Sequence, residues 1–100
     1  MILEHAILDV DPGETADYEA ALKQALPFIT ATPGFIRLEI RPCLEKPGRY
    51  LLLVEWDRLE DHTIGFRQSE RYEKWRALLH AFYDPFPRVE HFAEALDLES

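Results

Sequence analysis

The sequence predicts an α+β fold in which six elements follow one another as strand, helix, strand, strand, helix and strand. Helix-start signals follow Val10 and Trp56, apolar residues alternate in the segments around them, and Pro-Gly turns stand at 33–34 and 47–48. This order is that of the split βαβ, or ferredoxin-like, arrangement, whose four-stranded antiparallel sheet carries both helices on one face. With 100 residues, 47% of them hydrophobic, the chain is expected to form a single domain, residues 1–100.

The first strand and the first helix are predicted within residues 2–31. Aliphatic residues with partial alternation fill 2–10, and the segment DPGE then supplies Asp11 as N-cap, Pro12 at the first helical position and Glu14 for a capping box. A helix is expected over about 12–31, with a kink or a loosened last turn at Pro27. Its apolar stripe has helical spacing: Tyr18, Leu22, Ala25 and Ile29.

The segments FIRLEIRP and RYLLLVEW predict the two middle strands. In the first, Ile36, Leu38 and Ile40 on one face alternate with Phe35 and charged residues on the other, which is typical of a half-buried strand. The second segment is apolar on both faces and predicts a central strand covered above and below. Because both helices cover one side of the sheet, we expect a second copy of the chain to cover the other side, in a homodimer.

The second helical region is predicted to begin at Arg58, after Asp57 as N-cap. Gly65 is expected to weaken this helix, and Ser69 has the position of a second N-cap. Residues 88–96 predict the last strand. The helix that follows Ser69 is expected to turn four apolar residues inward: Tyr72, Trp75, Leu79 and Phe82.

Charge and composition exclude some partners. The net charge of −8 and the pI near 4.9 predict repulsion from phosphate backbones and anionic lipid, so we expect neither a nucleic acid nor a membrane as partner. The N-terminal segment lacks the basic residues and the long apolar run of a signal peptide or a membrane span, and it predicts a cytoplasmic protein. The single cysteine, Cys43, permits no internal disulfide.

A strand ending VEW, the segment DHTIGFRQSERYEKW and a closing VEHF together resemble the antibiotic biosynthesis monooxygenase family of small dimeric α+β barrels. The resemblance extends over essentially the whole chain. Members of this family include cofactor-independent oxygenases of polycyclic phenols and quinols, haem-degrading enzymes, and proteins of unknown role. The resemblance implies a pocket between helices and sheet, with His62, Phe66, Tyr72 and Trp75 along its wall.

The haem-degrading branch is the less favoured reading. That branch uses an axial histidine on the second helix, and the resemblance aligns Arg76 with this position, Phe66 with the family's tryptophan, and His5 or Ala6 with its asparagine. No glycine-rich phosphate loop supports flavin or nicotinamide. The four histidines share no i, i+3 or i, i+4 spacing, so no metal site is predicted. We therefore expect no cofactor.

His62 is the first candidate for acid–base chemistry. It follows Leu59 and precedes Phe66 at i, i+3 and i+7, which would turn an imidazole inward between apolar neighbours, where its pKa can be tuned. Tyr72 is the candidate proton donor. The alternative is that His62 only packs at the helix start. The candidates for substrate contact are Phe66, Arg67, Trp75, Leu79, His5 and His91.

His5 and His91 each follow a glutamate, in LEHA and VEHF. In the predicted order the first and last strands are adjacent and antiparallel, so the two Glu-His pairs could form a cluster with perturbed pKa values, as active sites often do. Structural cross-strand pairing or a place in the dimer interface is the alternative reading.

Two functional hypotheses follow. The first is a cofactor-independent monooxygenase that acts on a small phenol- or quinol-type aromatic. The second is a non-catalytic dimeric module that binds a small hydrophobic ligand or serves as a scaffold. A continuous cavity of about 300 Å³ or more that reaches His62 would favour chemistry or ligand binding, and a filled core would favour the scaffold.

Overall fold

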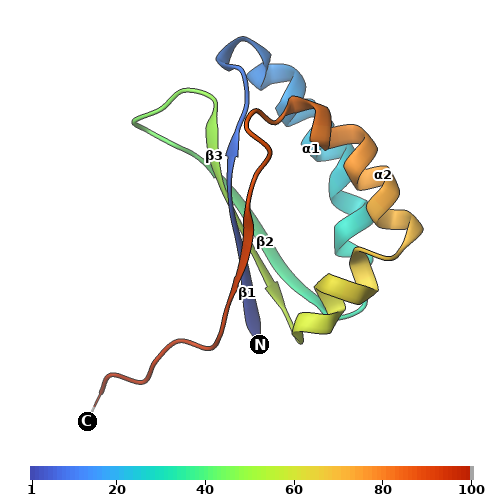
Figure 1. Cartoon of the computed structure of the whole chain (residues 1–100), viewed down its shortest axis with the longest axis vertical. Coiled ribbons are helices and arrows are strands. Elements are labelled where there is room, and N and C mark those ends of the chain that lie inside the picture. The colour runs from blue at the N-terminus through green and yellow to red at the C-terminus, as the bar shows by residue number, and fades with distance from the viewer. Residues whose placement is uncertain (100) are drawn as a thin grey trace.

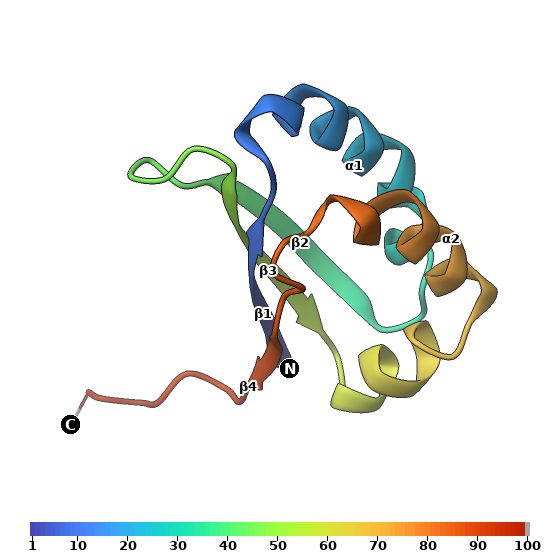
Figure 2. The same ribbon diagram turned by 45° about the horizontal axis from the view of Figure 1, so that its top comes forward.

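The computed structural model describes residues 1–99 and has the predicted order of elements (Figure 1). The four strands form one antiparallel sheet in the order β2-β3-β1-β4, and both helices pack against the same face (Figure 2). This confirms the ferredoxin-like prediction. The elements are β1 (Ile2–Asp9), α1 (Thr15–Thr30), β2 (Phe35–Pro42), β3 (Arg49–Trp56), α2 (Glu70–Leu79) and β4 (Val89–Phe92).

The first helix begins later than predicted. A short 3-10 turn, η1 (Pro12–Glu14), precedes α1, and the Asp11 side chain accepts a hydrogen bond of 2.8 Å from the backbone N–H of Gly13. Asp11 thus caps this turn instead of α1. The helix continues through Pro27 to Thr30, although the proline has no N–H to donate to the carbonyl of Lys23.

Near the start of β2, the side chains do not alternate between the two sheet faces as the sequence predicted. A β-bulge lies between Phe35 and Arg37, so Phe35 pairs with Trp56 while Arg37 pairs with the neighbouring Glu55. The extra residue, Ile36, is 46% exposed, and the Phe35 ring packs edge-on against Trp56 in the core. The prediction that Ile36 shares a face with Leu38 is therefore wrong, since a bulge shifts the alternation by one residue.

The central strand β3 separates the two faces of the sheet. Its even-numbered residues lie under the helices and are buried: Tyr50, Leu52, Val54 and Trp56. Leu51 and Leu53 on the opposite face are half-buried, and they have Ile7 and His5 of β1 beside them.

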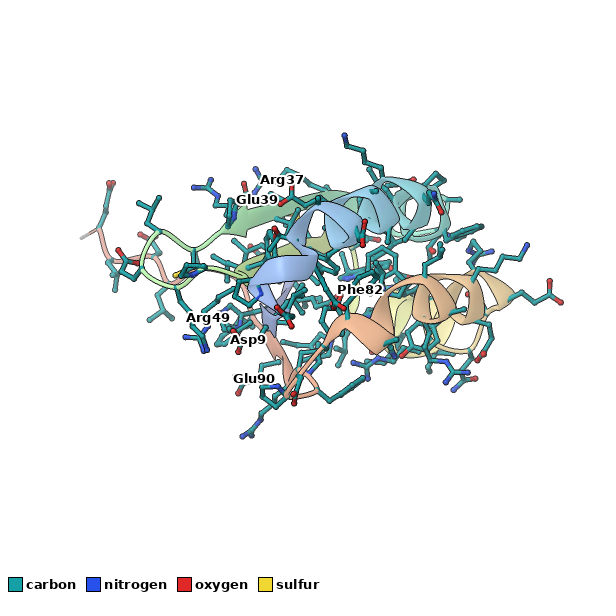
Figure 3. All side chains as sticks on the ribbon, turned by 90° about the horizontal axis from the view of Figure 1, so that it is seen from above. Asp9, Arg37, Glu39, Arg49, Phe82 and Glu90 are labelled. Carbon is teal, nitrogen blue, oxygen red and sulfur yellow. The ribbon has the colours of Figure 1, made fainter. Side chains whose placement is uncertain are left out.

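The outer face of the sheet carries an apolar centre with charged ends. Ile7 and Phe92 are 39% and 48% exposed there. Arg49 binds both carboxylate oxygens of Asp9, at 2.8 and 3.1 Å, and the two side chains lie together at one end (Figure 3). No helix of the described chain covers this face, and none of the helices in residues 1–99 is long and apolar enough to cross a bilayer.

The segment between β3 and α2 is not one regular helix. A π-helical turn, η2 (Asp61–Phe66), follows β3, and the N–H of Arg67 donates to the carbonyl of His62 over 3.0 Å. A new helix then begins after Ser69, whose Oγ accepts from the N–H of Tyr72 at 3.2 Å. The predicted N-cap at Ser69 is confirmed. The last strand is shorter than predicted and ends at Phe92.

Replacing Ser69 with alanine is expected to lower the free energy of unfolding by about 1 kcal/mol, because the first turn of α2 loses its cap. Urea unfolding measures the change. Thr30→Ala serves as control, since this exposed threonine ends α1 and contributes only a long bond of 3.4 Å to Pro27. An equal change in the two variants would contradict the capping role.

Candidate functional site

A cavity of about 380 Å³ lies between the sheet and α2 and reaches His62. Ligand pockets in proteins have volumes of about 300–1,000 Å³, so this space is large enough for a small molecule. Polar and ionisable side chains share its wall with aromatic and aliphatic ones: Glu4, Ala6, Leu8, Ile29, Leu52, His62, Phe66, Arg67, Tyr72, Trp75, His80, Tyr83, Phe86, Pro87 and Val89.

His62 is buried, with 3% of its surface exposed, and it lies at the centre of a polar network. Its ring stacks on Trp56 with 5.2 Å between centroids and an angle of 19°. Nδ1 lies 2.7 Å from Nε2 of His91, which is a short hydrogen bond. Nε2 lies 3.4 Å from Oε1 of Glu4, too far for a strong one. The two ring nitrogens therefore have different environments.

Glu4 is the buried carboxylate of this network. It comes from β1, is 5% exposed, and accepts a hydrogen bond of 2.9 Å from Nε1–H of Trp56. Burial raises the pKa of Glu4, while the Trp56 hydrogen bond and the charge of Arg67 act in the opposite direction. The β1–β4 register places Glu4 opposite His91, so the two strands bring both groups to the helix-covered face.

The local sequence explains how His62 reaches this position. In the π-helical turn, residues four apart lie nearly above one another, and the rings of His62 and Phe66 stack with 6.3 Å between centroids. Leu59, the third member of the predicted stripe, is 39% exposed. The wider π-turn has thus turned two of the three side chains inward. Such turns frequently occur at functional sites.

Burial makes His62 a neutral imidazole at physiological pH. Desolvation lowers the pKa of His62 to about 3, and the charge of Arg67 and the proximity of His91 act in the same direction. The pKa of His91 is also lowered, first by burial and then by Arg67. A hydrogen bond between two neutral imidazoles needs one N–H and one lone pair, and the His62–His91 pair can supply both.

Replacing His62 with phenylalanine is expected to make the fold less sensitive to mild acid. An unfolded histidine titrates near 6.5, whereas folded His62 stays neutral down to about 3, so below pH 6.5 only the unfolded state binds this proton. Stability is therefore lost as the pH falls, by about 2 kcal/mol between pH 7 and 5 through this group. Urea unfolding at both pH values should show a smaller loss in the variant, and equal losses would contradict a buried neutral His62.

Aromatic rings form the α2 side of the cavity. Tyr72 meets the ring of Phe66 edge-on at 5.3 Å and that of His80 at 5.9 Å. Trp75 also lines the cavity and is 8% exposed. Burial and the charge of Arg76 lower the pKa of His80. Flat rings around a partly polar space suit an aromatic ligand with a hydroxyl group.

The structure places the predicted site residues in three locations. The cavity wall contains His62, Phe66, Arg67, Tyr72 and Trp75. His91 contacts His62 but is not part of the lining, and Leu79 is fully buried in the core. His5 lies on the opposite face of the sheet, where its ring meets Phe92 edge-on at 5.7 Å. The two Glu-His pairs are adjacent, as expected, but they face opposite sides.

Two polar lining residues, Glu4 and His80, were not among the candidates for catalysis or substrate contact, although Glu4 belongs to one of the two predicted Glu-His pairs. A signal for Glu4 was present, because it alternates with Ile2, Ala6 and Leu8 along β1 and so occupies a core-facing position. His80 and Tyr83 lie beyond the regular part of α2, where helical spacing no longer predicts facing.

The described residues contain no group of three or more His, Cys, Asp or Glu side chains placed to hold a metal ion. Glu4 and His91 approach opposite nitrogens of the His62 ring, so one ion could not bind all three groups. The haem reading also lacks its ligand. Arg76, at the aligned position, is ion-paired with Glu73 on the surface of α2 over 2.8 Å.

Comparison with known proteins identifies the family of the chain. A family model described as antibiotic biosynthesis monooxygenase matches residues 1–78. The chain belongs to the antibiotic biosynthesis monooxygenase family. The resemblance noted in the sequence is therefore confirmed.

Relatives of this monooxygenase-family protein cover nearly its whole length. The uncharacterized protein YczJ of Bacillus subtilis (strain 168) is 49% identical over 94 residues, which make up 94% of this chain and 99% of YczJ. A crystal structure from Bordetella bronchiseptica, described as a candidate antibiotic biosynthesis monooxygenase, is 35% identical with a TM-score of 0.88 and covers 95% of this chain and 97% of that one. SnoaB of Streptomyces nogalater, a cofactor-independent oxygenase, has the same fold, with a TM-score of 0.76, 18% identity, and coverage of 99% and 97%.

Proposed function

We propose that the protein is a cofactor-independent monooxygenase that acts on a small phenol- or quinol-type aromatic. The observation that carries the proposal is the cavity of about 380 Å³ in which a buried, neutral imidazole lies 3.4 Å from a buried carboxylate. Family membership and the shared fold of SnoaB, a cofactor-independent oxygenase, support oxygenase chemistry without a cofactor.

The base in this proposal is His62. With its proton on Nδ1, donated to His91, the ring keeps a lone pair on Nε2, next to Glu4. An imidazole with a lowered pKa is a weak base, so the nearby carboxylate of Glu4 has to stabilise the imidazolium that forms as a substrate hydroxyl loses its proton. His91 holds the ring in the required tautomer and orientation.

The deprotonated substrate is the reductant. A phenolate is electron-rich and can pass electrons to dioxygen, and conversion of a phenol to a quinone consumes one dioxygen molecule and releases one water. One oxygen atom becomes the new carbonyl, and the other leaves as the water. Tyr72 is the proposed donor to the developing oxygen anion, and the aromatic and aliphatic part of the cavity wall would contact the ring of the substrate.

An oxygen-electrode assay over naphthols, naphthohydroquinones and hydroxylated anthracenes tests this function. We expect oxygen uptake above the rate of each compound alone, one dioxygen per quinone formed, and no inhibition by EDTA. Tyr72→Phe should slow turnover and leave binding nearly unchanged. Failure of every compound to raise oxygen uptake, with binding still detectable by calorimetry, would instead favour the non-catalytic ligand-binding module.

We also propose that the protein forms a homodimer through the outer face of the sheet. Ile7 of β1 and Phe92 of β4 expose apolar surface there. Leu51 and Leu53 of β3 lie between β1 and the edge strand β2. Charged pairs such as Arg37–Glu55, at 3.0 Å, stand at the margin and would form a polar rim. The cytoplasmic location expected from the sequence stays a prediction.

A further inference from the structure

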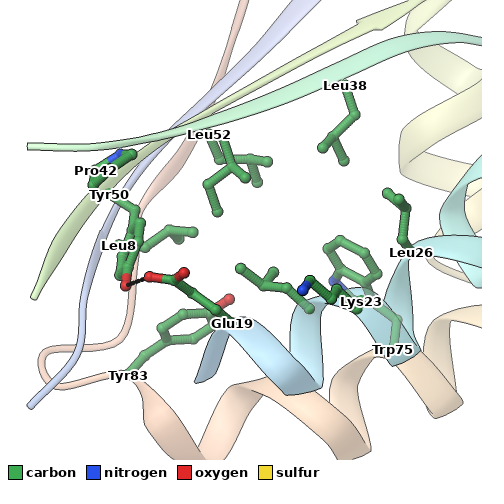
Figure 4. Close-up of a pocket in the computed structure, with 12 residues that line it drawn as sticks. Leu8, Glu19, Lys23, Leu26, Leu38, Pro42, Tyr50, Leu52, Trp75 and Tyr83 are labelled. Carbon is green, nitrogen blue, oxygen red and sulfur yellow. Dashed lines mark hydrogen bonds between the residues drawn. The ribbon is translucent and has the colours of Figure 1, made fainter. Parts of the chain in front are cut away.

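A second cavity, of about 270 Å³, lies between α1 and strands β2 and β3 (Figure 4). Its wall is mainly aliphatic, and Leu22 and Leu26 of α1 face Leu38 and Ile40 of β2 across it. The oxygenase chemistry proposed above makes no use of this space. A hollow lined by flexible aliphatic side chains suits a flexible aliphatic group better than a flat polar ring.

The second cavity adjoins the His62 cavity. Four side chains line both spaces, namely Leu8, Leu52, Trp75 and Tyr83. These side chains form the wall between the two spaces, so a ligand that occupies both has to pass between them. We call the two spaces the His62 lobe and the aliphatic lobe.

The aliphatic lobe offers few hydrogen-bonding groups to a ligand. Among its ionisable residues, Glu19 is already engaged, since it accepts a hydrogen bond of 2.7 Å from the hydroxyl of Tyr50. The hydroxyl of Tyr83 is bonded to that of Tyr18 at 2.9 Å. Lys23 is exposed and lies on α1 at the solvent side. Recognition here would therefore depend on apolar contact.

We propose that the aliphatic lobe binds the alkyl substituent of the aromatic ligand whose hydroxyl end occupies the His62 lobe. The substrate class is then narrower than phenols and quinols in general: it consists of those that carry an unbranched aliphatic chain on the side of the ring away from the reacting hydroxyl. This inference deepens the proposed function and shares its His62 lobe.

Calorimetric binding of para-cresol, para-butylphenol, para-hexylphenol and para-octylphenol to the full chain tests the proposal. Each methylene buried in an apolar site tightens binding by about fourfold, until the lobe is full. The heat-capacity change of binding should become more negative along the same series. Because the assay needs no turnover, absence of oxygenase activity would remove the proposed function and leave this result intact.

Leu38→Phe fills the aliphatic lobe and supplies the decisive variant. We expect it to reduce the affinity for para-hexylphenol by tenfold or more and to change that for para-cresol by less than about threefold. Ile36→Phe is the matched control on the same strand, because Ile36 lies in the bulge outside both cavities. Leu22→Phe fills the lobe from α1 and replaces Leu38→Phe if that variant does not fold.

Three results would overturn the proposal. The first is no binding by any member of the series, and the second is an affinity that does not change with chain length. The third is a dependence on chain length that appears only after residues 94–100 are removed. That result would mean that Leu96 and Leu98, which are 81% and 85% exposed, fill the aliphatic lobe of a second copy.

Discussion

His62→Gln is expected to lower kcat/KM for a quinol substrate by about 100-fold or more. Removal of a general base typically costs 10²–10⁴-fold in rate, and glutamine keeps a polar side chain of similar reach without the basic nitrogen. Because His62 is 3% exposed, the variant also leaves His91 and Glu4 without their partner, so its fold has to be checked by circular dichroism and urea unfolding.

His5→Gln is the matched control for this experiment. His5 neighbours Glu4 in the sequence but lies on the opposite face of the sheet, beside Phe92, and it does not line the cavity. The control should keep its kcat/KM within about threefold of the wild type. Unchanged turnover in His62→Gln, measured on a compound that the wild type oxygenates, would remove His62 from the proposed chemistry.

Leu53→Glu is expected to convert the proposed dimer into a monomer. Leu53 occupies the middle of the outer sheet face, opposite His5 of β1 and Glu39 of β2. Two symmetry-related carboxylates buried in one apolar interface would cost about 3 kcal/mol or more, which weakens association at least about 100-fold. Sedimentation velocity at micromolar concentration measures the change.

Leu44→Glu provides the comparison for the dimer test. Leu44 is 95% exposed in the turn between β2 and β3, so a charge there should leave the association state as in the wild type. A wild-type protein that sediments as a stable monomer at micromolar concentration would contradict the dimer directly.

The sequence predicted the order of the elements because each segment carries a signal of its own. The double-sided apolar pattern of residues 49–56 identified a central strand, and Ser69 marked the start of α2. The alternation of apolar residues could not predict the bulge at Ile36. One extra residue moves the side chains before it to the other face of the sheet and leaves the composition of the strand unchanged. The same limit explains why Phe35 was placed on the wrong face.

The candidate site was predictable in part. Helical spacing predicted that the side chains of His62 and Phe66 face inward, and both are buried in the structure. The element that positions them is a π-helical turn and not an α-helix. Glu4 was predicted only as part of a Glu-His pair and not as a cavity residue, because a carboxylate is rarely buried and only a three-dimensional arrangement supplies the Trp56 N–H that compensates for its burial. The contact between His62 and His91 joins residues 29 positions apart, and local patterns carry no information about such a pair.

An NMR titration of the histidine side-chain nitrogens measures the protonation state of His62. We expect His62 to stay neutral to below pH 5, with its Nδ1 signal showing the His91 hydrogen bond, and we expect a naphthol to shift its Nε2 signal. A His62 that titrates near 6.5, like a solvent-exposed imidazole, and does not respond to the naphthol would rule out a buried, neutral His62 as the base of this cavity.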